Sequence, residues 1–68
     1  MIMVATENRR LAAARVLVGL TQRQLAQRVG TKEIEISRIE TGRLCPPEQL
    51  KRRIAEVLGK PTFEIFDC

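Results

Sequence analysis

The chain has 68 residues, which is enough for one small domain but not for a second, and it contains no histidine, tryptophan or tyrosine. Twelve basic and eight acidic side chains leave a net charge of +4, which favours a polyanionic partner, although the same excess can serve solubility alone. Short aliphatic residues dominate the apolar set, so residues 1–68 are expected to form a single all-α domain.

The termini and the cysteines indicate a cytoplasmic protein. The opening residues MIMV are too short for a secretory signal, and no apolar run approaches the roughly 18 residues that cross a bilayer. Cys45 and Cys68 lack the spacing of a metal site or of a disulfide framework. We therefore expect reduced thiols, no metal, no cofactor and no membrane partner.

The first predicted helix covers residues 8–18, NRRLAAARVLV. Ala, Leu and Arg are strong helix formers. Four residues share one face of this helix: Leu11, Ala14, Arg15 and Val18. Gly19 follows and supplies a helix stop.

The second predicted helix begins at the stretch TQRQ, residues 21–24. It has the pattern of a capping box, in which the Thr21 hydroxyl and the Gln24 amide each reach the other residue's backbone. Leu25, Ala26 and Val29 form the apolar face. Gly30 favours a left-handed end, so this helix is only about two turns long.

The stretch TKEIEIS, residues 31–37, is ambiguous, because its alternation of polar and apolar residues is also typical of a half-buried strand. No other segment shows the strand pattern needed to pair with it. Thr31 can instead cap a helix directly after a turn formed by residues 29–31. We therefore predict a third helix over residues 32–41.

A helical wheel divides this third helix into two sides. Ile36 and Ile39 lie together on one side, which we expect to enter the core. The opposite side contains Ile34, Ser37, Arg38 and Thr41. Ile34 is therefore predicted to be an exposed isoleucine without a role in the core.

The C-terminal part predicts two further elements. After Gly42 and the connection RLCPP, Pro47 is expected as the first residue of a helix, PEQLKRRIAEVL. Its predicted inward residues are Leu50, Ile54, Val57 and Leu58. One more helical turn is expected within residues 61–66, with Ile65 and Phe66 folding back onto the core. The expected fold is a compact bundle of five short helices.

The segment LTQRQLAQRVGTKEIEISRIETGR resembles the helix-turn-helix of the phage Cro and repressor family, also called the XRE family, which is lambda-repressor-like. Its specific elements are LTQ at the start of the second helix, Gly30 in the turn, the core isoleucines and IETGR at the end. The resemblance extends from about Arg15 to Phe66. It implies a helix-turn-helix pair at about residues 22–41 whose second helix lies in the major groove.

The resemblance also implies which residues contact DNA. Phosphate contacts are expected from Gln22 at the start of the second helix, and from Thr41 and Arg43 just beyond the third. Base reading is expected from the outward residues Lys32, Glu33, Ile34 and Arg38.

Each base-reading residue has a chemical counterpart on a base edge. Lys32 or Arg38 can donate to guanine O6 and N7, Glu33 can accept from cytosine N4, and Ile34 can pack on a thymine methyl group. The alternative role of Glu33 is to stabilise the helix dipole, and that of Glu35 is to pair with Arg38 one turn on. In the family an Arg of the first helix pairs with a Glu that ends the recognition helix, which implies a structural ion pair between Arg15 and Glu40.

The sequence thus predicts a DNA-binding transcriptional regulator, a repressor that binds double-stranded DNA as a homodimer on a two-fold operator. Weak self-association through the C-terminal region is expected. The alternative is a protein-interaction module, such as an antitoxin-like protein, that uses Ile34 and the flanking carboxylates as its surface. An enzyme is not expected, since the chain has no histidine and no glycine-rich phosphate loop, and no small-molecule ligand is expected either.

Overall fold

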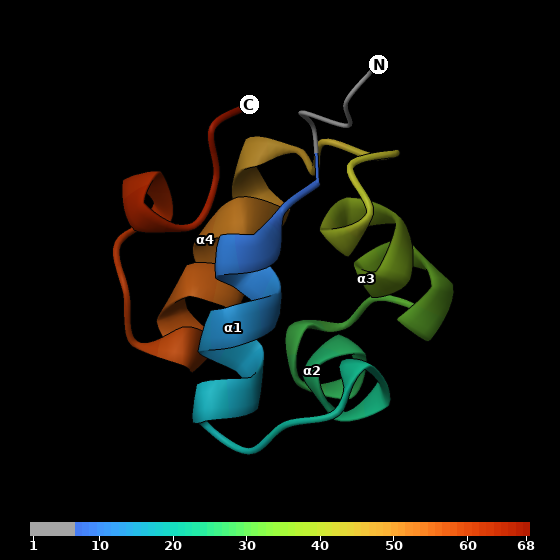
Figure 1. Ribbon diagram of the computed structural model, residues 1–68. Coiled ribbons are helices and arrows are strands. Elements are labelled where there is room, and N and C mark those ends of the chain that lie inside the picture. The colour runs from blue at the N-terminus through green and yellow to red at the C-terminus, as the bar shows by residue number, and fades with distance from the viewer. Residues whose placement is uncertain (1–6) are drawn as a thin grey trace.

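The computed structural model describes residues 7–68, so the MIMV stretch lies outside the described residues. Within them the chain forms four α-helices and a short 3-10 turn and contains no strand (Figure 1). The elements in chain order are α1 (Arg9–Leu17), α2 (Gln22–Val29), α3 (Glu33–Glu40), α4 (Glu48–Leu58) and η1 (Thr62–Glu64). The all-helical prediction is confirmed, and residues 33–40 are helical rather than extended.

The expected fifth helix is wrong in kind, because η1 is a 3-10 turn of only three residues. Pro61, with an extended ψ of 153°, precedes it, and Ile65 ends it. The next residue, Phe66, is buried together with Ile65. The chain must turn inward to bury both side chains, which leaves no length for a full α-helical turn.

Helix α1 is capped at its start by Asn8, whose side-chain oxygen accepts a hydrogen bond from the Leu11 amide at 2.9 Å. Leu11 and Ala14 are buried as predicted. Val18 is not, because the helix already ends at Leu17 and 47% of Val18 remains exposed. The apolar face is therefore one turn shorter than the sequence pattern suggests.

Helix α2 begins with the predicted capping box. The Gln24 amide donates to the Thr21 hydroxyl oxygen at 3.0 Å, and the Thr21 amide donates to the Gln24 side chain at 2.9 Å. The helix ends at Gly30, whose φ of 78° is the left-handed conformation that glycine adopts without strain. The predicted start and stop signals of this helix are both present.

The turn between α2 and α3 lies one residue later than predicted, because residues 30–32 separate the two helices. Lys32, not Thr31, occupies the N-cap position of α3. The Thr31 hydroxyl instead bonds to the Glu35 carboxylate, which also accepts the Lys32 amide at 3.4 Å. Thr31 and Glu35 thus fasten the turn to the first turn of α3.

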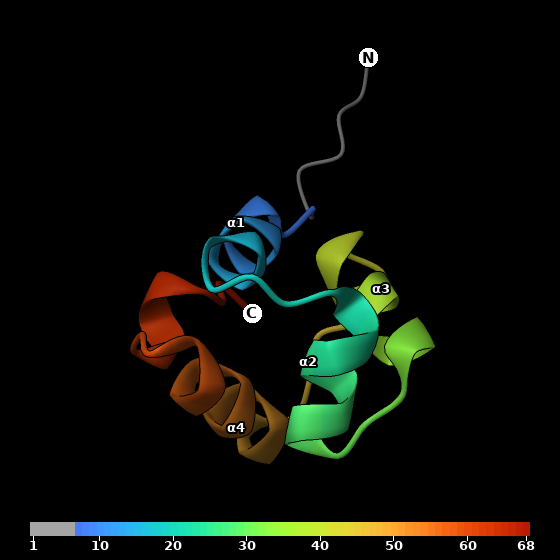
Figure 2. The same ribbon diagram turned by 90° about the horizontal axis from the view of Figure 1, so that it is seen from below.

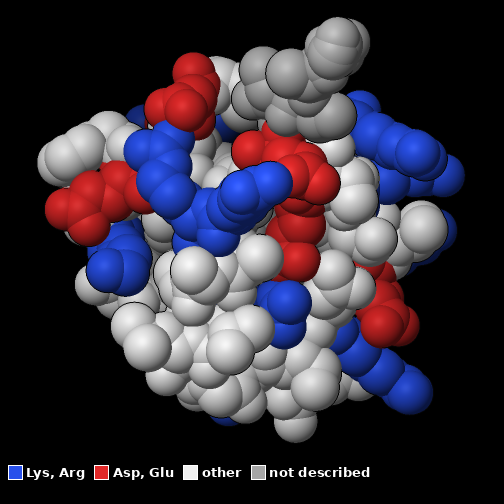
Figure 3. Space-filling model, viewed as in Figure 1, with Lys and Arg blue, Asp and Glu red and all other residues white. Residues whose placement is uncertain are grey.

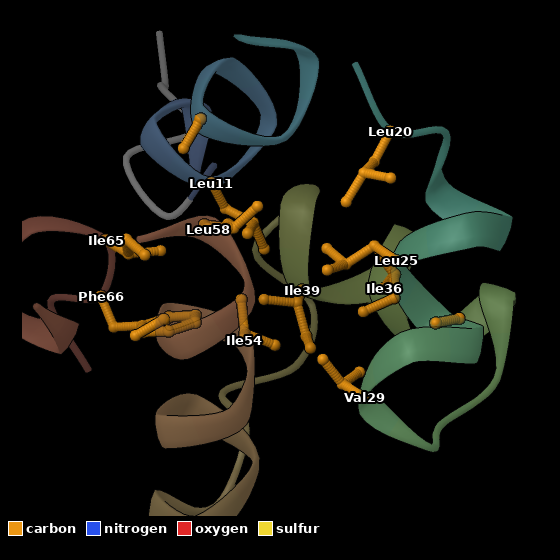
Figure 4. Packing of buried hydrophobic residues seen from close by; sticks show 13 residues of the cluster. Leu11, Leu20, Leu25, Val29, Ile36, Ile39, Ile54, Leu58, Ile65 and Phe66 are labelled. Atoms are coloured by element: carbon orange, nitrogen blue, oxygen red, sulfur yellow. The ribbon is translucent and has the colours of Figure 1, made fainter. Parts of the chain in front are cut away.

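The core lies between the four helices and is made of aliphatic side chains together with Phe66 (Figure 4). Ile36 and Ile39 of α3 point into it, as the wheel predicted. The side chains with least exposure, under 2%, come from every α-helix and from the C-terminal tail: Leu11, Leu25, Ile36, Ile39, Ile54 and Ile65. Leu50 and Val57 of α4 pack against this core in a partly buried state. Pro47 is the N-cap of α4 rather than its first residue.

Cys45 and Cys68 form a disulfide, so the expectation of reduced thiols is wrong. Their Cα atoms are 6.0 Å apart although they are separated by 23 positions in the sequence. The tail folds back along α4 once Ile65 and Phe66 enter the core, and this brings Cys68 to the connection that precedes α4 (Figure 1). The inward return of Ile65 and Phe66 is as predicted, but the spacing of the two cysteines does not indicate that they pair.

Among residues 7–68, none of the helices combines the length and the apolar character needed to span a bilayer.

Candidate nucleic-acid interface

Helices α2 and α3 lie side by side, joined by their short turn (Figure 2). Burial of Ile36 and Ile39 fixes which side of α3 faces inward. The opposite side is open to solvent, and the four predicted base-reading residues are all exposed: Lys32, Glu33, Ile34 and Arg38. We call these four exposed residues, at the start and on the solvent side of α3, the α3 face.

The start of α2 borders the α3 face. Gln22 lines a shallow hollow together with Glu33, Ile34 and Ser37. Ile34 is 52% exposed at the edge of this hollow. A residue predicted to bind phosphate and two predicted to read bases thus lie next to one another.

The N-terminal end of α2 presents unsatisfied backbone donors. The capping box satisfies the amides of Thr21 and Gln24. The amides of Gln22 and Arg23 have no hydrogen-bond partner among residues 7–68. These donors, together with the positive end of the helix dipole, form a local environment that suits a phosphate.

The Gln22 side chain has a contact that the sequence did not reveal. Its Nε2 donates to Oε1 of Glu40 at 2.9 Å. An amide nitrogen has two hydrogens, so one remains available for a second acceptor. Gln22 can therefore contact a phosphate while it stays attached to the end of α3.

Glu40 also forms the expected ion pair with Arg15. Arg15 Nε lies 2.7 Å from Glu40 Oε2, and only 14% and 8% of the two side chains are exposed. Arg15 Nη1 donates to the Leu20 carbonyl oxygen at 2.7 Å as well. We call Arg15, Gln22 and Glu40 the Glu40 cluster; it links α1, the start of α2 and the end of α3.

Thr41 and Arg43, the other predicted phosphate contacts, differ in their local bonding. The Thr41 hydroxyl faces the carbonyl oxygens of Ser37 at 3.0 Å and Arg38 at 3.2 Å, so its single hydrogen is already used within the chain. Arg43 is exposed and forms no ion pair within residues 7–68. Its backbone amide donates to the Arg38 carbonyl oxygen at 2.8 Å, which fixes the backbone while the guanidinium is directed to solvent.

The expected pair between Glu35 and Arg38 is absent from the described residues. The Glu35 carboxylate instead accepts hydrogen bonds from the Thr31 hydroxyl and the Lys32 amide. An acidic side chain at the third position of a helix reaches back to the N-cap amide in this way. Arg38 is exposed and has no ion-pair partner within residues 7–68. Its guanidinium is therefore available to an external acceptor.

The charge on this side of the molecule is mixed but mainly basic. Lys32, Arg38 and Arg43 are exposed, against the single exposed carboxylate of Glu33. In Figure 3 basic side chains project along the edge on which α3 lies, with an acidic side chain among them. Such a surface attracts a polyanion and places one hydrogen-bond acceptor within it.

Comparison with known proteins decides the family. A sequence model of the family described as Helix-turn-helix matches residues 11–65, which include every predicted contact residue. This chain belongs to the XRE-type helix-turn-helix family. A relative from Methanothermobacter thermautotrophicus, named as an uncharacterized HTH-type transcriptional regulator, is 45% identical to this helix-turn-helix protein over 47 residues. The aligned part covers 69% of this chain and 68% of that relative.

Proposed function

We propose that this helix-turn-helix protein, a DNA-binding regulator of transcription, is a repressor that binds a two-fold operator as a homodimer. The observation that carries the proposal is the α3 face, which is exposed and basic and is held in place by the Glu40 cluster. A rigid helix with such a surface matches the requirements of major-groove recognition. Occupation of an operator then excludes the transcription machinery from the same DNA.

Base reading is assigned to the exposed residues of the α3 face. Arg38 and Lys32 donate to guanine O6 and N7, and Glu33 accepts from cytosine N4. Ile34, which is 52% exposed, offers an apolar contact to a thymine methyl group. Each such contact contributes about 1–3 kcal/mol of discrimination between bases.

Phosphate binding is assigned to residues on either side of the α3 face. At the start of α2, the donors available to a phosphate are the backbone amides of Gln22 and Arg23 and the second hydrogen of Gln22 Nε2. Arg43 offers an exposed charge beyond the C-terminal end of α3. These contacts set the register of the protein on DNA but do not read the sequence.

A dimer is proposed because α3 is short. Its eight residues span only about 12 Å, enough for a few base pairs. Two copies on inverted half-sites about one helical turn apart would read a longer site. Phe63 in the C-terminal region is 73% exposed, and an aromatic side chain in that position is suited to contact a second copy.

The test begins with selection of duplexes from a random DNA pool, followed by fluorescence anisotropy with the selected duplex. We expect Arg38→Ala to weaken binding by about 5-fold to 150-fold, which corresponds to 1–3 kcal/mol. Arg52→Ala is the matched control, because Arg52 is an exposed arginine on α4, outside the helix-turn-helix pair. It removes the same charge and should change affinity little.

Two results would contradict the proposal. One is that no duplex is enriched by selection; the other is that Arg38→Ala and Arg52→Ala weaken binding equally. Lack of enrichment would favour the protein-interaction alternative, for which exposed Ile34 beside Glu33 provides an apolar contact with an acidic border.

A further inference from the structure

The disulfide joins two parts of the molecule that have different roles. Cys45 lies in the connection between α3 and α4, two residues after Arg43. Cys68 lies two residues after Phe66, the last buried residue of the tail. The closed loop contains all of α4 and η1, while the α3 face and the Glu40 cluster lie outside it.

Both cysteines are reachable from solvent. Each is an exposed residue, and both line an open hollow together with Asn8, Arg10 and Leu44. A thiolate can attack only a sulfur that it can approach. The position of this bond therefore permits exchange with a dissolved thiol while the domain remains folded.

Few other contacts hold the last two residues. Asp67 pairs with Arg10, but 87% and 49% of these side chains are exposed, and such pairs contribute little. The Cys68 carbonyl oxygen accepts a bond from Lys51 Nζ at the surface. The disulfide is therefore the main link between the end of the tail and the connection before α4.

The connection itself has independent anchors. The amides of Arg43 and Leu44 both donate to the Arg38 carbonyl oxygen, at 2.8 and 3.2 Å, and Pro46 is buried. These contacts do not depend on the sulfur atoms. Loss of the disulfide would thus leave the end of α3 and the position of Arg43 in place.

We propose that Cys45 and Cys68 form a reversible redox site that sets the fraction of the chain that is folded. A dithiol reductant is the reaction partner by chemical class. Its first thiolate attacks one sulfur and releases the other as a protein thiolate, which gives a mixed disulfide. Its second thiolate then displaces the remaining protein sulfur. The dithiol leaves as a cyclic disulfide, and the protein gains two electrons and two protons.

The physical consequence is a change in stability rather than in the DNA-reading surface. A disulfide that closes a loop of this length restricts the unfolded chain. For a domain of this size the expected difference in melting temperature is on the order of 10 °C or more. The effect on DNA occupancy follows only if the proposed function is correct, whereas the redox chemistry does not depend on it.

The experiment compares the full chain in oxidised and reduced form. Free thiols are counted under native conditions before and after millimolar dithiothreitol, and both forms are melted by circular dichroism. We expect no free thiol before reduction, two after it, and a melting temperature lower by about 10 °C or more. The double variant Cys45→Ser/Cys68→Ser should melt like the reduced chain and ignore the reductant.

Three outcomes would overturn the redox proposal: two free thiols in the air-oxidised chain, resistance to dithiothreitol until the chain is unfolded, or equal melting of both forms. A DNA measurement separates this proposal from the proposed function. At a temperature where both forms are folded, they should bind a duplex with a single half-site within about 3-fold of each other, because the α3 face is outside the loop, whereas Phe63, the proposed dimer contact, is inside it. A larger difference in affinity would contradict the proposal that the disulfide acts only on stability. Absence of DNA binding in both forms would reject the proposed function and leave the redox proposal intact.

Discussion

Glu40 bonds both to Arg15, its structural partner, and to Gln22, a proposed phosphate contact. It accepts hydrogen bonds from Arg15 at 2.7 Å and from Gln22 at 2.9 Å. The sequence resemblance implied the Arg15–Glu40 pair and a phosphate role for Gln22, but not the bond between Gln22 and Glu40. That bond depends on how α2 and α3 pack, and no motif spacing describes it. Gln22 is thus held by the same carboxylate that holds α1.

The first prediction concerns the Arg15–Glu40 pair. Arg15→Ala should lower the free energy of unfolding by about 3 kcal/mol, because it leaves a carboxylate that is almost buried without its partner charge. Urea denaturation followed by circular dichroism measures the change. Arg9→Ala is the control, since the Arg9 side chain is 89% exposed in its pair with Glu7, and it should cost less than about 1 kcal/mol. Equal losses in the two variants would show that burial of the pair is unimportant.

The second prediction separates phosphate contact from base reading. Arg43→Ala should weaken binding to all duplexes by a similar factor and reduce the slope of log K against log salt by about one. Arg38→Ala should instead weaken the selected duplex more than a scrambled one. Anisotropy titrations at several salt concentrations measure both effects. An unchanged slope for the Arg43→Ala variant would show that Arg43 does not contact a phosphate.

At the scale of elements, the sequence predicted helix existence and type better than helix ends. The capping box at Thr21 and the stop at Gly30 are both present, because these signals act within four or five residues. The prediction of Thr31 as the cap of α3 is wrong, since Lys32 is the N-cap and the Thr31 hydroxyl bonds to Glu35. The helical turn expected within residues 61–66 is present as the three-residue 3-10 turn η1 rather than as a fifth α-helix, and Ile65 and Phe66 are buried as predicted.

A third prediction tests the turn that orients α3. Gly30→Ala should lower the free energy of unfolding by about 1–2 kcal/mol, because a Cβ is disfavoured at a φ of 78°. The nearest atom to such a Cβ is Arg53 Nη1 at 4.0 Å, so the loss would come from the backbone and not from a clash. Gly30→Asn should lose less, since Asn tolerates the left-handed region. A lower melting temperature for the Gly30→Asn variant than for the Gly30→Ala variant would refute this explanation.

At the scale of the whole molecule, the core and its closure by Ile65 and Phe66 are predictable from the sequence, but the disulfide is not. Periodicity identified the inward residues of α2 and α3, because burial follows the helical repeat. In α4 it identified Ile54 and Leu58, whereas Leu50 and Val57 are only partly buried and the buried Ala55 is not among the predicted residues. The expectation of reduced thiols is wrong, because the spacing of Cys45 and Cys68 in the sequence does not show that the return of the tail brings these two residues together. The contact residues and the Arg15–Glu40 pair came from family resemblance, and the structure adds the bond from Gln22 to Glu40.

The fourth prediction concerns assembly. Phe63→Ser should weaken self-association and lower affinity for a two-fold operator, because it removes the large exposed apolar side chain of the C-terminal region. Binding to a single half-site should be unaffected. Sedimentation equilibrium and anisotropy with one-site and two-site duplexes measure these effects. Leu17→Ser, at a position that is 81% exposed on α1, is the control. A Phe63 variant that associates normally would place the dimer contact elsewhere.

The most direct test of recognition by the α3 face is an NMR titration of the isotope-labelled chain with a duplex obtained by selection. The account predicts that the largest amide shift changes fall on residues 32–38, on Gln22 and Arg23 at the start of α2, and on residues 41–43. The outer side of α4 around Arg52 should change little. Changes concentrated on α1 or α4, with α3 unaffected, would contradict the assignment of α3 as the DNA-reading helix.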